Sequence, residues 1–158
     1  MTNRRSLLQM LALGSAGVAL GITPSLAKTF EVTHTPDEWK KILGPDAYHI
    51  MREQGTERPF TSALLNEHRK GTFICAGCAL PLFASNTKFE SGTGWPSFWQ
   101  PLPNAVETES DNSWMMSRTE VHCRRCGGHL GHVFDDGPKP TGLRYCMDGL
   151  ALKFKPAA

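Results

Sequence analysis

Short apolar runs separated by turn residues make up most of the chain beyond residue 70. They span residues 72–75, 80–83, 114–118, 120–123, 131–134, 143–147 and 150–154, with turn signals such as Asp-Gly-Pro at 136–138 and Thr-Gly at 141–142 between them. Strands of this length bounded by such turns are typical of a mostly antiparallel β domain. The pattern is unclear between residues 88 and 112, where Gly, Ser, Pro and Asn are frequent.

Two short helices are predicted before the strands. Thr35 is followed by Pro, Asp and Glu38, the order of an N-cap, a first-turn proline and a capping box. Gly44 and the proline after it end this helix, and a second helix runs from about residue 46 to 54 with Gly55 as its C-cap. Apolar residues on both helices indicate that they pack on the outside of a sheet. The sequence therefore predicts a mainly β, α+β fold.

The first 27 residues differ from the rest of the chain. Arg4 and Arg5 precede an apolar run at 7–22, and Ser25 and Ala27 supply small residues at the −3 and −1 positions of a cleavage site. This order predicts a signal peptide at 1–27, and paired arginines favour the twin-arginine route, which exports folded proteins to the periplasm. A Sec signal with incidental arginines, or an uncleaved anchor, is the alternative.

Composition and charge limit the remaining possibilities. A chain of 158 residues with 40% apolar residues can bury one ordinary core, so residues 28–158 are expected to form a single domain and to act as a monomer. Once Arg4 and Arg5 are set aside, 15 of the 17 basic side chains remain, equal to the 15 acidic ones. A neutral domain argues against nucleic acid as a partner and against stable membrane association after cleavage.

Four of the five cysteines form two Cys-x-x-Cys pairs. Together they supply four thiolates, the donor set of a closed tetrahedral site for one structural zinc ion. The predicted ligands are Cys75, Cys78, Cys123 and Cys126, with Gly77 and Gly127 suited to the tight turns. Two disulfides are the alternative in an exported protein, although a Cys-x-x-Cys disulfide closes only a small ring. Iron also accepts four thiolates, so the sequence does not identify the metal.

The fifth cysteine, Cys146, stands apart from these pairs. Strand alternation places Arg144, Cys146 and Asp148 on one face of the predicted strand. A cation beside a thiol favours the nucleophilic thiolate, which argues against an inert buried cysteine. His129 and His132 follow the second cysteine pair closely. Since four thiolates already complete a tetrahedron, both imidazoles are available as proton donors.

Four motifs occur in a fixed order along the chain. They are Thr-Glu-Arg-Pro-Phe at 56–60, Ser-Gly-Thr-Gly-Trp-Pro-Ser-Phe at 91–98, Gly-His-Leu-Gly-His-Val-Phe-Asp at 128–135 and Arg-Tyr-Cys at 144–146. In this order they closely resemble the methionine-R-sulfoxide reductase family, over about residues 39 to 154. The resemblance implies two antiparallel β-sheets, a structural zinc on the paired cysteines and Cys146 as the nucleophile. The implied substrate is the R epimer of oxidised methionine in proteins or peptides.

Sulfoxide chemistry supports the same assignment. The sulfur is electrophilic, but the oxygen departs only as it gains protons, so the reaction needs a thiolate on one side and proton donors on the other. Cys146 would attack the sulfur while His129 and His132 protonate or hydrogen-bond the oxygen. The products are methionine and a sulfenic acid on Cys146, the first step of cysteine oxidation.

Recognition of one epimer requires an apolar seat for the S-methyl group. The face of Trp95, on the Gly-rich loop, offers this seat and a favourable sulfur–aromatic contact, with Phe134 completing the wall. Plain core packing is the alternative for Trp95. The predicted substrate contacts are Trp95, Phe134 and Arg144.

Two positions depart from the family pattern. Many members carry a resolving cysteine where this chain has Thr93, so an external reductant, a thioredoxin-like protein or a small thiol, is expected to reduce Cys146 directly. Many members also have Asn where this chain has Asp148. An ionised carboxylate there would raise the pKa of Cys146, whereas a protonated one could donate a hydrogen bond. Asp148 is therefore expected to be kept from ionising or to point away.

Two other classes of protein explain part of the sequence. Paired knuckles alone are common in zinc-binding interaction modules without catalytic activity, and Cys-x-x-Cys pairs occur in thiol-disulfide oxidoreductases. The first class leaves Cys146 and the two histidines unexplained. The second lacks its usual strand-to-helix context here. Reduction of methionine sulfoxide is therefore the leading prediction.

Overall fold

The computed structural model describes residues 28–112 and 117–158. The predicted signal peptide at 1–27 and most of the predicted strand at 114–118 lie outside the described residues. The helical elements are α1 (Pro36–Glu53) and the 3₁₀ helices η1 (Ala63–Asn66), η2 (Ser85–Thr87) and η4 (Gly149–Ala151). The strands are β1 (Gly71–Cys75), β2 (Pro81–Ala84), β3 (Lys88–Phe89), β4 (Ser97–Phe98), β5 (Val106–Asp111), β6 (Arg118–Cys123), β7 (His129–Phe134), β8 (Arg144–Met147) and β9 (Leu152–Pro156).

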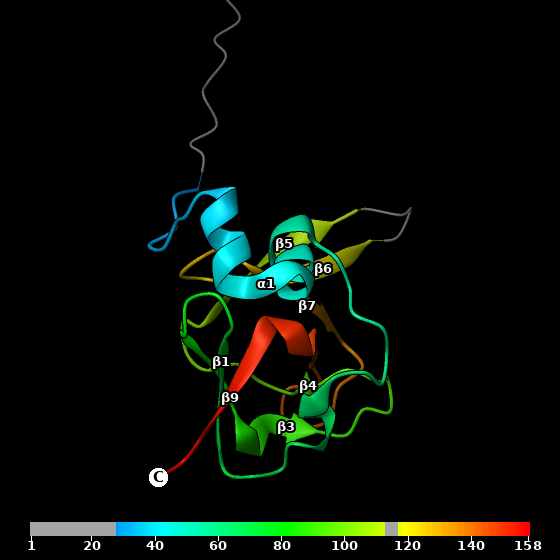
Figure 1. The fold of residues 1–158 in the computed structure, drawn as a ribbon. Helices are drawn as coiled ribbons and strands as arrows, with labels where there is room; N and C mark the ends of the chain where they lie inside the picture. Colours follow the sequence, from blue (N-terminus) through cyan, green and yellow to red (C-terminus); the bar gives the residue numbers. More distant parts are fainter. Residues whose placement is uncertain (1–27, 113–116) are drawn as a thin grey trace, which may run out of the picture.

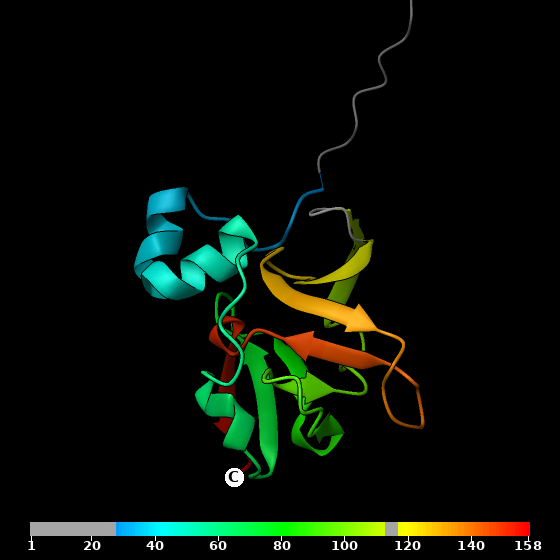
Figure 2. The same ribbon diagram turned by 90° about the vertical axis from the view of Figure 1, so that its right-hand side faces the viewer.

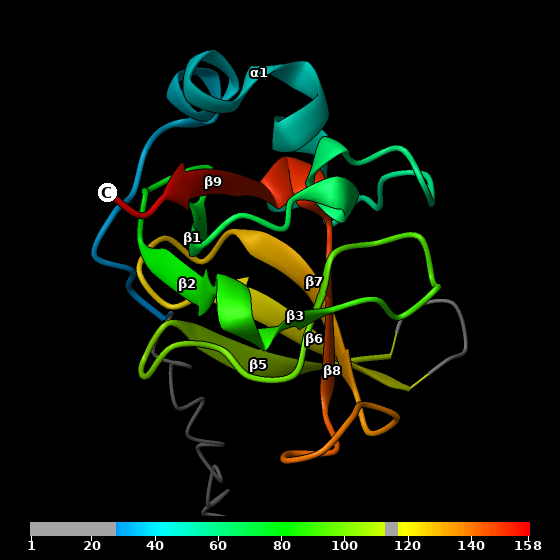
Figure 3. The same cartoon turned by 90° about the horizontal axis from the view of Figure 1, so that it is seen from below.

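The strands form two sheets in which every pair is antiparallel. The smaller sheet has the order β2-β1-β9, and the larger has the order β3-β4-β8-β7-β6-β5 (Figure 1). Helix α1 lies at one end of the molecule beside β9 and η4 (Figure 3). The predicted fold class, mainly β with two antiparallel sheets and an N-terminal helical part, is confirmed. In the described part of the chain, no helix has the length and apolar character needed to cross a membrane.

The predicted helix start is confirmed, and the two predicted helices form one kinked element. The Thr35 side chain accepts from Glu38 N, and Thr35 N donates to the Glu38 carboxylate at 2.8 Å, which completes the capping box. Gly44 has φ of 72° and breaks the helix, so its two halves meet at an angle (Figure 2). The predicted C-cap was wrong: Gln54 takes the left-handed conformation, and Gly55 follows it.

Aromatic side chains join the two sheets. Phe83 of β2 stacks on Phe98 of β4 with ring centroids 4.3 Å apart, and Phe73 of β1 meets Phe98 edge-on at 4.9 Å. All three rings are fully buried. Aromatic pairs of this kind stabilise a core beyond the area they bury. The stack therefore fixes β4, and with it the adjacent strand β8, against the smaller sheet.

One segment that the sequence left unassigned contains strands, and one predicted strand boundary was wrong. The segment 88–112 contains three strands, β3, β4 and β5, which the sequence did not reveal. Two of these have only two residues, and most of the six residues of β5 are polar or charged. At the C-terminus, the strand begins at Leu152, because Gly149–Ala151 forms the 3₁₀ turn η4 instead.

Gly131 allows β7 to approach β8 closely, and its substitution tests how far stability depends on that approach. It has φ of 144°, and a Cβ there would lie 2.2 Å from Cys146 O. Gly131→Ala should lower the free energy of unfolding by about 2–4 kcal/mol, through left-handed strain and overpacking. Gly44→Ala is the matched control, because Gly44 also has positive φ but open space around its Cβ position. Gly44→Ala should lower the free energy of unfolding, measured with urea, by about 1 kcal/mol. Equal costs at the two positions would contradict the close approach.

Candidate active site

Two turns of the same conformation carry the paired cysteines. Ala79 N donates to Cys75 O at 2.9 Å, and Gly127 N donates to Cys123 O at 2.8 Å. The residue after each pair takes a left-handed φ, 57° at Ala79 and 65° at Gly127. Gly127 thus fills the role predicted for it. In the first turn this conformation falls on Ala79 rather than on Gly77.

The two turns bring the four predicted metal ligands together. The sulfurs of Cys75, Cys78, Cys123 and Cys126 all lie within 4.8 Å of one another. The Cys75–Cys126 and Cys78–Cys123 sulfur distances are 3.7 Å and 3.5 Å. A tetrahedral ion with metal–sulfur bonds of about 2.3 Å would separate its sulfurs by about 3.8 Å, whereas disulfide sulfurs lie about 2.05 Å apart. All five cysteines are free thiols, so the cluster fits a tetrahedral metal ion rather than two disulfides.

Helix α1 packs on this cluster. Arg52 Nη1 donates to Cys126 O at 3.0 Å, and the Arg52 guanidinium lies over the Trp39 ring at 4.8 Å from its centroid. Met51 is buried beside Gly77 and Gly128 of the two turns. A metal ion in the cluster would therefore stabilise the contact between the helix and both sheets as well as the turns themselves.

Cys146 lies in the interior of the larger sheet, away from the cluster. Its Cα pairs with His132 of β7 on one side and with Ser97 of β4 on the other. Side chains at paired positions of neighbouring strands point to the same face, about 5 Å apart. The sheet register thus brings His132, predicted as a catalytic residue, next to the predicted nucleophile.

Hydroxyl groups line the approach to the Cys146 sulfur. Thr93 Oγ1 lies 3.8 Å from Cys146 Sγ, and Ser91 Oγ lies 2.8 Å from Thr93 Oγ1 and 2.7 Å from Ser97 Oγ. Burial raises the pKa of the Cys146 thiol. The Thr93 hydroxyl and the charge of Arg144 act in the opposite direction, because both favour the thiolate. The thiol is therefore mainly protonated at pH 7 before substrate binds.

A cavity of about 120 Å³ opens beside Cys146. It contains the predicted nucleophile, both predicted aromatic substrate contacts, one of the two histidines and Asp148. The full lining consists of Thr56, Trp95, Arg118, Gly131, His132, Phe134, Cys146 and Asp148. An apolar side and a polar side thus face one small space next to a thiol, which is the kind of arrangement expected of a substrate site.

His132 is held by a carboxylate from β5. Its Nε2–H donates to Asp111 Oδ2 at 2.8 Å, and Arg118 Nη2 donates to the same oxygen at 2.7 Å. Burial lowers the pKa of His132, and the hydrogen bond to Asp111 only partly offsets this. The imidazole is therefore mainly neutral at pH 7, with its orientation fixed by Asp111.

His129 lies behind the cavity wall rather than on it. Its Nδ1–H donates to Glu120 Oε1 at 2.7 Å, and its Nε2 lies 3.8 Å from Asp148 Oδ2. It borders a second hollow of about 280 Å³, which also contains Glu120 and His132. The sequence predicted direct contact of His129 with the reacting oxygen, whereas in the structure it reaches the cavity through Asp148.

Asp148 follows β8 directly and points into the cavity. Its Oδ1 accepts the N–H of Glu57 at 2.9 Å, and the residue is only 3% exposed. Burial raises its pKa to about 6, against the lowering effects of the Glu57 hydrogen bond and of His129. The carboxyl is thus brought toward neutrality but is mainly ionised at pH 7, so the expectation that Asp148 is kept from ionising or points away was wrong. The predicted common face with Cys146 is retained in the cavity, although Asp148 itself lies beyond the end of the strand.

Arg144 supports the site without bordering the cavity. Its guanidinium pairs with both oxygens of Asp136, at 2.8 Å and 2.9 Å, and lies 4.4 Å from the centroid of the Phe134 ring. It favours the Cys146 thiolate through its charge. The structure thus places Arg144 behind Phe134, whereas the sequence predicted contact with the substrate.

Some of the cavity lining was not singled out from the sequence. Arg118 and Asp111 are register partners on β6 and β5, and the predominantly polar composition of β5 hid that pairing. Thr56 adjoins Glu57, whose backbone carbonyl accepts the indole N–H of Trp95 at 3.1 Å. The motif at 56–60 was the available signal for this segment, but a motif alone does not show which neighbours it contacts.

Comparison with known proteins gives the family. A model described as the SelR domain matches residues 43–156. The chain belongs to the SelR-domain family. The match includes both cysteine pairs and every residue of the cavity lining.

Relatives of this SelR-domain chain are named peptide methionine sulfoxide reductase MsrB. The protein from Leptospira interrogans is 54% identical over 127 residues, which cover 80% of this chain and 97% of that protein. The protein from Methanosarcina barkeri is 53% identical over 125 residues, 78% of this chain and 88% of its own length. The protein from Pseudomonas putida is 53% identical over 127 residues, 80% and 96% of the two chains.

The charge of Asp148 should be measurable at Cys146. Above about pH 6 the ionised Asp148 raises the pKa of the Cys146 thiol. Asp148→Asn removes that charge and keeps an oxygen for the Glu57 N–H, so Cys146 should form its thiolate at lower pH. Iodoacetamide labelling of the peptide that contains Cys146, followed by mass spectrometry across pH, measures this shift. Exposed Asp37→Asn is the control and should leave the profile unchanged. A Cys146 profile that is unshifted or moved to higher pH in Asp148→Asn would contradict the electrostatic account.

Proposed function

We propose that this SelR-domain protein reduces the R epimer of methionine sulfoxide in proteins and peptides, with Cys146 as the nucleophile. The observation that carries the proposal is the cavity that Cys146 shares with Trp95, His132 and Asp148. It joins a thiol, an aromatic surface and two groups that can hold or donate a proton, which sulfoxide reduction requires. The names of the relatives describe reductases of the same substrate class.

In the proposed reaction one oxygen atom passes from methionine sulfoxide to Cys146. The cysteine sulfur bonds to the sulfoxide sulfur, and Asp148 or His132 takes up the thiol proton and passes it to the sulfoxide oxygen. The hydroxyl group then passes from the substrate sulfur to the cysteine sulfur: the substrate sulfur–oxygen bond and the sulfur–sulfur bond both break, the cysteine sulfur–oxygen bond forms, and methionine leaves with the electron pair of the sulfur–sulfur bond. Cys146 ends as a sulfenic acid. The methionine sulfur is reduced by two electrons, and the cysteine sulfur is oxidised by two.

The epimer preference follows from the two sides of the cavity. Trp95 and Phe134 supply the apolar side for the S-methyl group, and His132 and Asp148 supply the polar side for the oxygen. In the opposite epimer the methyl group and the oxygen exchange places relative to the attacking sulfur. The methyl group would then meet the polar side, and the oxygen would lose its hydrogen-bonding partners.

An external thiol regenerates Cys146 in this proposal. One thiol condenses with the sulfenic acid to a mixed disulfide and water, and a second thiol releases Cys146 and leaves as the external disulfide. Thr93 lies 3.8 Å from the Cys146 sulfur and cannot form a disulfide. The remaining four cysteines are gathered in the metal cluster. A thioredoxin-like protein or a small thiol is therefore the proposed reductant.

The metal and the location complete the proposal. We assign one structural zinc ion to Cys75, Cys78, Cys123 and Cys126, because four thiolates at these distances suit zinc well. We assign residues 1–27 to a twin-arginine signal peptide and residues 28–158 to the mature reductase domain, on the arginine pair and apolar run that precede the cleavage site. The mature protein is proposed to act in the periplasm as a monomer that repairs oxidised proteins.

The two rival classes are less well supported. A zinc-binding module without catalytic activity gives no reason for a separate cysteine in a cavity with Trp95, His132 and Asp148. A thiol-disulfide oxidoreductase would use a Cys-x-x-Cys pair, but here the two pairs form one four-sulfur cluster.

The function is tested by assaying the R and S epimers of methionine sulfoxide in a peptide, with dithiothreitol as reductant. The wild type should reduce the R epimer and contain one zinc ion per chain. Cys146→Ser should lose activity by about a thousandfold or more and keep its zinc, since the nucleophile lies outside the cluster. Activity in Cys146→Ser, or equal rates with the two epimers, would contradict the proposal.

The absence of a resolving cysteine gives a second test. Thr93→Cys places a thiol close to the Cys146 sulfur, so one turnover without reductant should yield an intramolecular disulfide between residues 93 and 146. In the wild type the same experiment should yield a sulfenic acid on Cys146 that reacts with dimedone. Ser91→Cys is the comparison variant, because Ser91 contacts Thr93 and Ser97 rather than Cys146. An intramolecular disulfide to Cys146 in the wild type would refute direct reduction by an external thiol.

A further inference from the structure

Glu57 is a buried carboxylate that takes no direct part in the proposed reaction. The residue is 8% exposed, and its carboxylate accepts Gly149 N at 2.5 Å and Leu150 N at 3.3 Å. Burial raises its pKa, and these two hydrogen bonds act against the shift. A buried carboxylate loses much of its hydration. Its contacts here are ones that an apolar side chain could not make.

Glu57 and the segment that begins at Asp148 hydrogen-bond to each other in both directions. The Glu57 N–H donates to Asp148 Oδ1 at 2.9 Å, while the Glu57 carboxylate accepts the backbone N–H groups of the two residues that follow Asp148. The two segments lie 91 residues apart in sequence. Glu57 thus holds the Asp148 carboxyl in the cavity through one hydrogen bond from its N–H, and its carboxylate anchors the following segment through two more.

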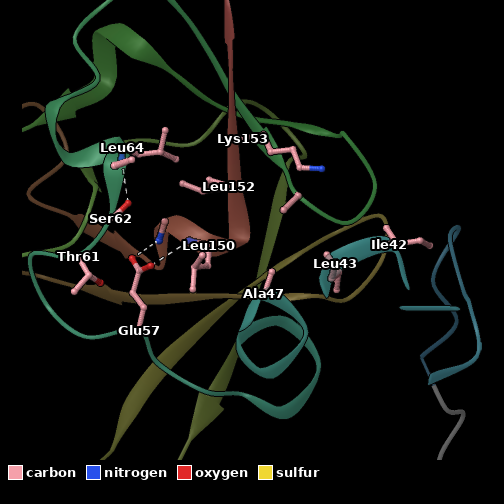
Figure 4. Close-up of a pocket in the computed structure, with 13 residues that line it drawn as sticks. Ile42, Leu43, Ala47, Glu57, Thr61, Ser62, Leu64, Leu150, Leu152 and Lys153 are labelled. Atoms are coloured by element: carbon pink, nitrogen blue, oxygen red, sulfur yellow. Dashed lines mark hydrogen bonds between the residues drawn. The ribbon is translucent and has the colours of Figure 1, made fainter. Parts of the chain in front are cut away.

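Glu57 also holds the aromatic side of the cavity. Its carbonyl oxygen accepts the indole N–H of Trp95 at 3.1 Å, so one residue ties the aromatic side to the polar side. Glu57 does not itself line the sulfoxide cavity. It lines a separate cavity of about 510 Å³ beside α1 and η4, where its carboxylate points to the η4 backbone (Figure 4).

There is no room for a side chain at Gly149, the first residue of η4. A Cβ on Gly149 would lie 1.8 Å from Ser62 Oγ and 3.2 Å from Glu57 Oε1. A glycine is therefore needed where the Glu57 carboxylate meets the backbone. The backbone N–H groups of Gly149 and Leu150 are directed at Glu57 rather than at solvent.

We propose that Glu57 is a positioning residue for sulfoxide reduction, which acts through Asp148 and Trp95 without touching the substrate. This inference rests on the proposed function and extends its site by one residue. The Glu57 side chain anchors the segment to η4, and the backbone of the same residue then holds the carboxyl and the indole at the separation that the substrate requires. Its loss should therefore act on catalysis through those two side chains.

A double-mutant cycle tests the action through Asp148. Glu57→Gln keeps one acceptor oxygen but places an amide N–H₂ against a backbone N–H, so kcat/KM for the R-sulfoxide peptide should fall about tenfold. In an Asp148→Asn background the same change should cost less than about threefold, because the carboxyl that Glu57 positions is already gone. Exposed Glu90→Gln removes the same charge and should leave kcat/KM unchanged in both backgrounds. Equal losses from Glu57→Gln in the two backgrounds would overturn the proposal.

A second measurement is independent of activity. Hydrogen exchange of the Trp95 indole N–H, assigned by its disappearance in Trp95→Phe, should become faster in Glu57→Gln, with the zinc content and the circular dichroism spectrum unchanged. Unchanged exchange would contradict the positioning role even if catalysis fell. A wild type inactive on methionine sulfoxide, with the indole exchange faster in Glu57→Gln, would refute the proposed function and leave the Glu57–Trp95 linkage in place.

Discussion

Antiparallel pairing of β8 with β7 and β4 is the constraint on which the site depends. The register sets His132 opposite Cys146 on one side and Ser97 on the other, and a shift of one residue would turn the thiol to the other face of the sheet. The aromatic stack of Phe83 on Phe98 holds β4, and the close approach allowed by Gly131 holds β7. The four-cysteine cluster does not contact Cys146 and supports the site indirectly, because it fixes the ends of β1 and β6 and the helix packed on them.

Electrostatics in the cavity balance opposing effects on one thiol. Burial and the Asp148 carboxylate disfavour the thiolate, while Arg144 and the Thr93 hydroxyl favour it. A thiol that stays protonated until substrate arrives brings its own proton to a reaction that requires protonation of the departing oxygen. It is also less exposed to adventitious oxidation, because the thiolate is the reactive form. The Asp148–Glu57 linkage joins this balance to the fold, because Glu57 orients the Asp148 carboxyl through its N–H and secures η4 through its own carboxylate.

The sequence was sufficient for features that depend on local order. Cysteine spacing predicted the four-sulfur cluster, Thr35 and Glu38 predicted the helix start, and the motif order predicted the family. The sequence did not predict features that depend on contacts between segments far apart in the chain. Nothing local shows that Asp111 holds His132, because β5 is largely polar and the contact depends on how the strands pair. The positions of His129 behind Asp148 and of Arg144 beside Asp136 depend likewise on how strand residues meet residues beyond the strand ends. Glu57 lay within a quoted motif, but its reciprocal contacts appear only when residues 57 and 148 meet.

Isotope tracing tests the central claim, oxygen transfer to Cys146, most directly. The protein is mixed with a stoichiometric amount of a peptide containing R-methionine sulfoxide labelled with oxygen-18, without a reductant, and is then trapped and digested for mass spectrometry. One oxygen-18 atom should be found on the peptide that contains Cys146, together with unlabelled methionine in the product. Conversion to methionine with no label on Cys146, or with label on another residue, would contradict oxygen transfer to this sulfur.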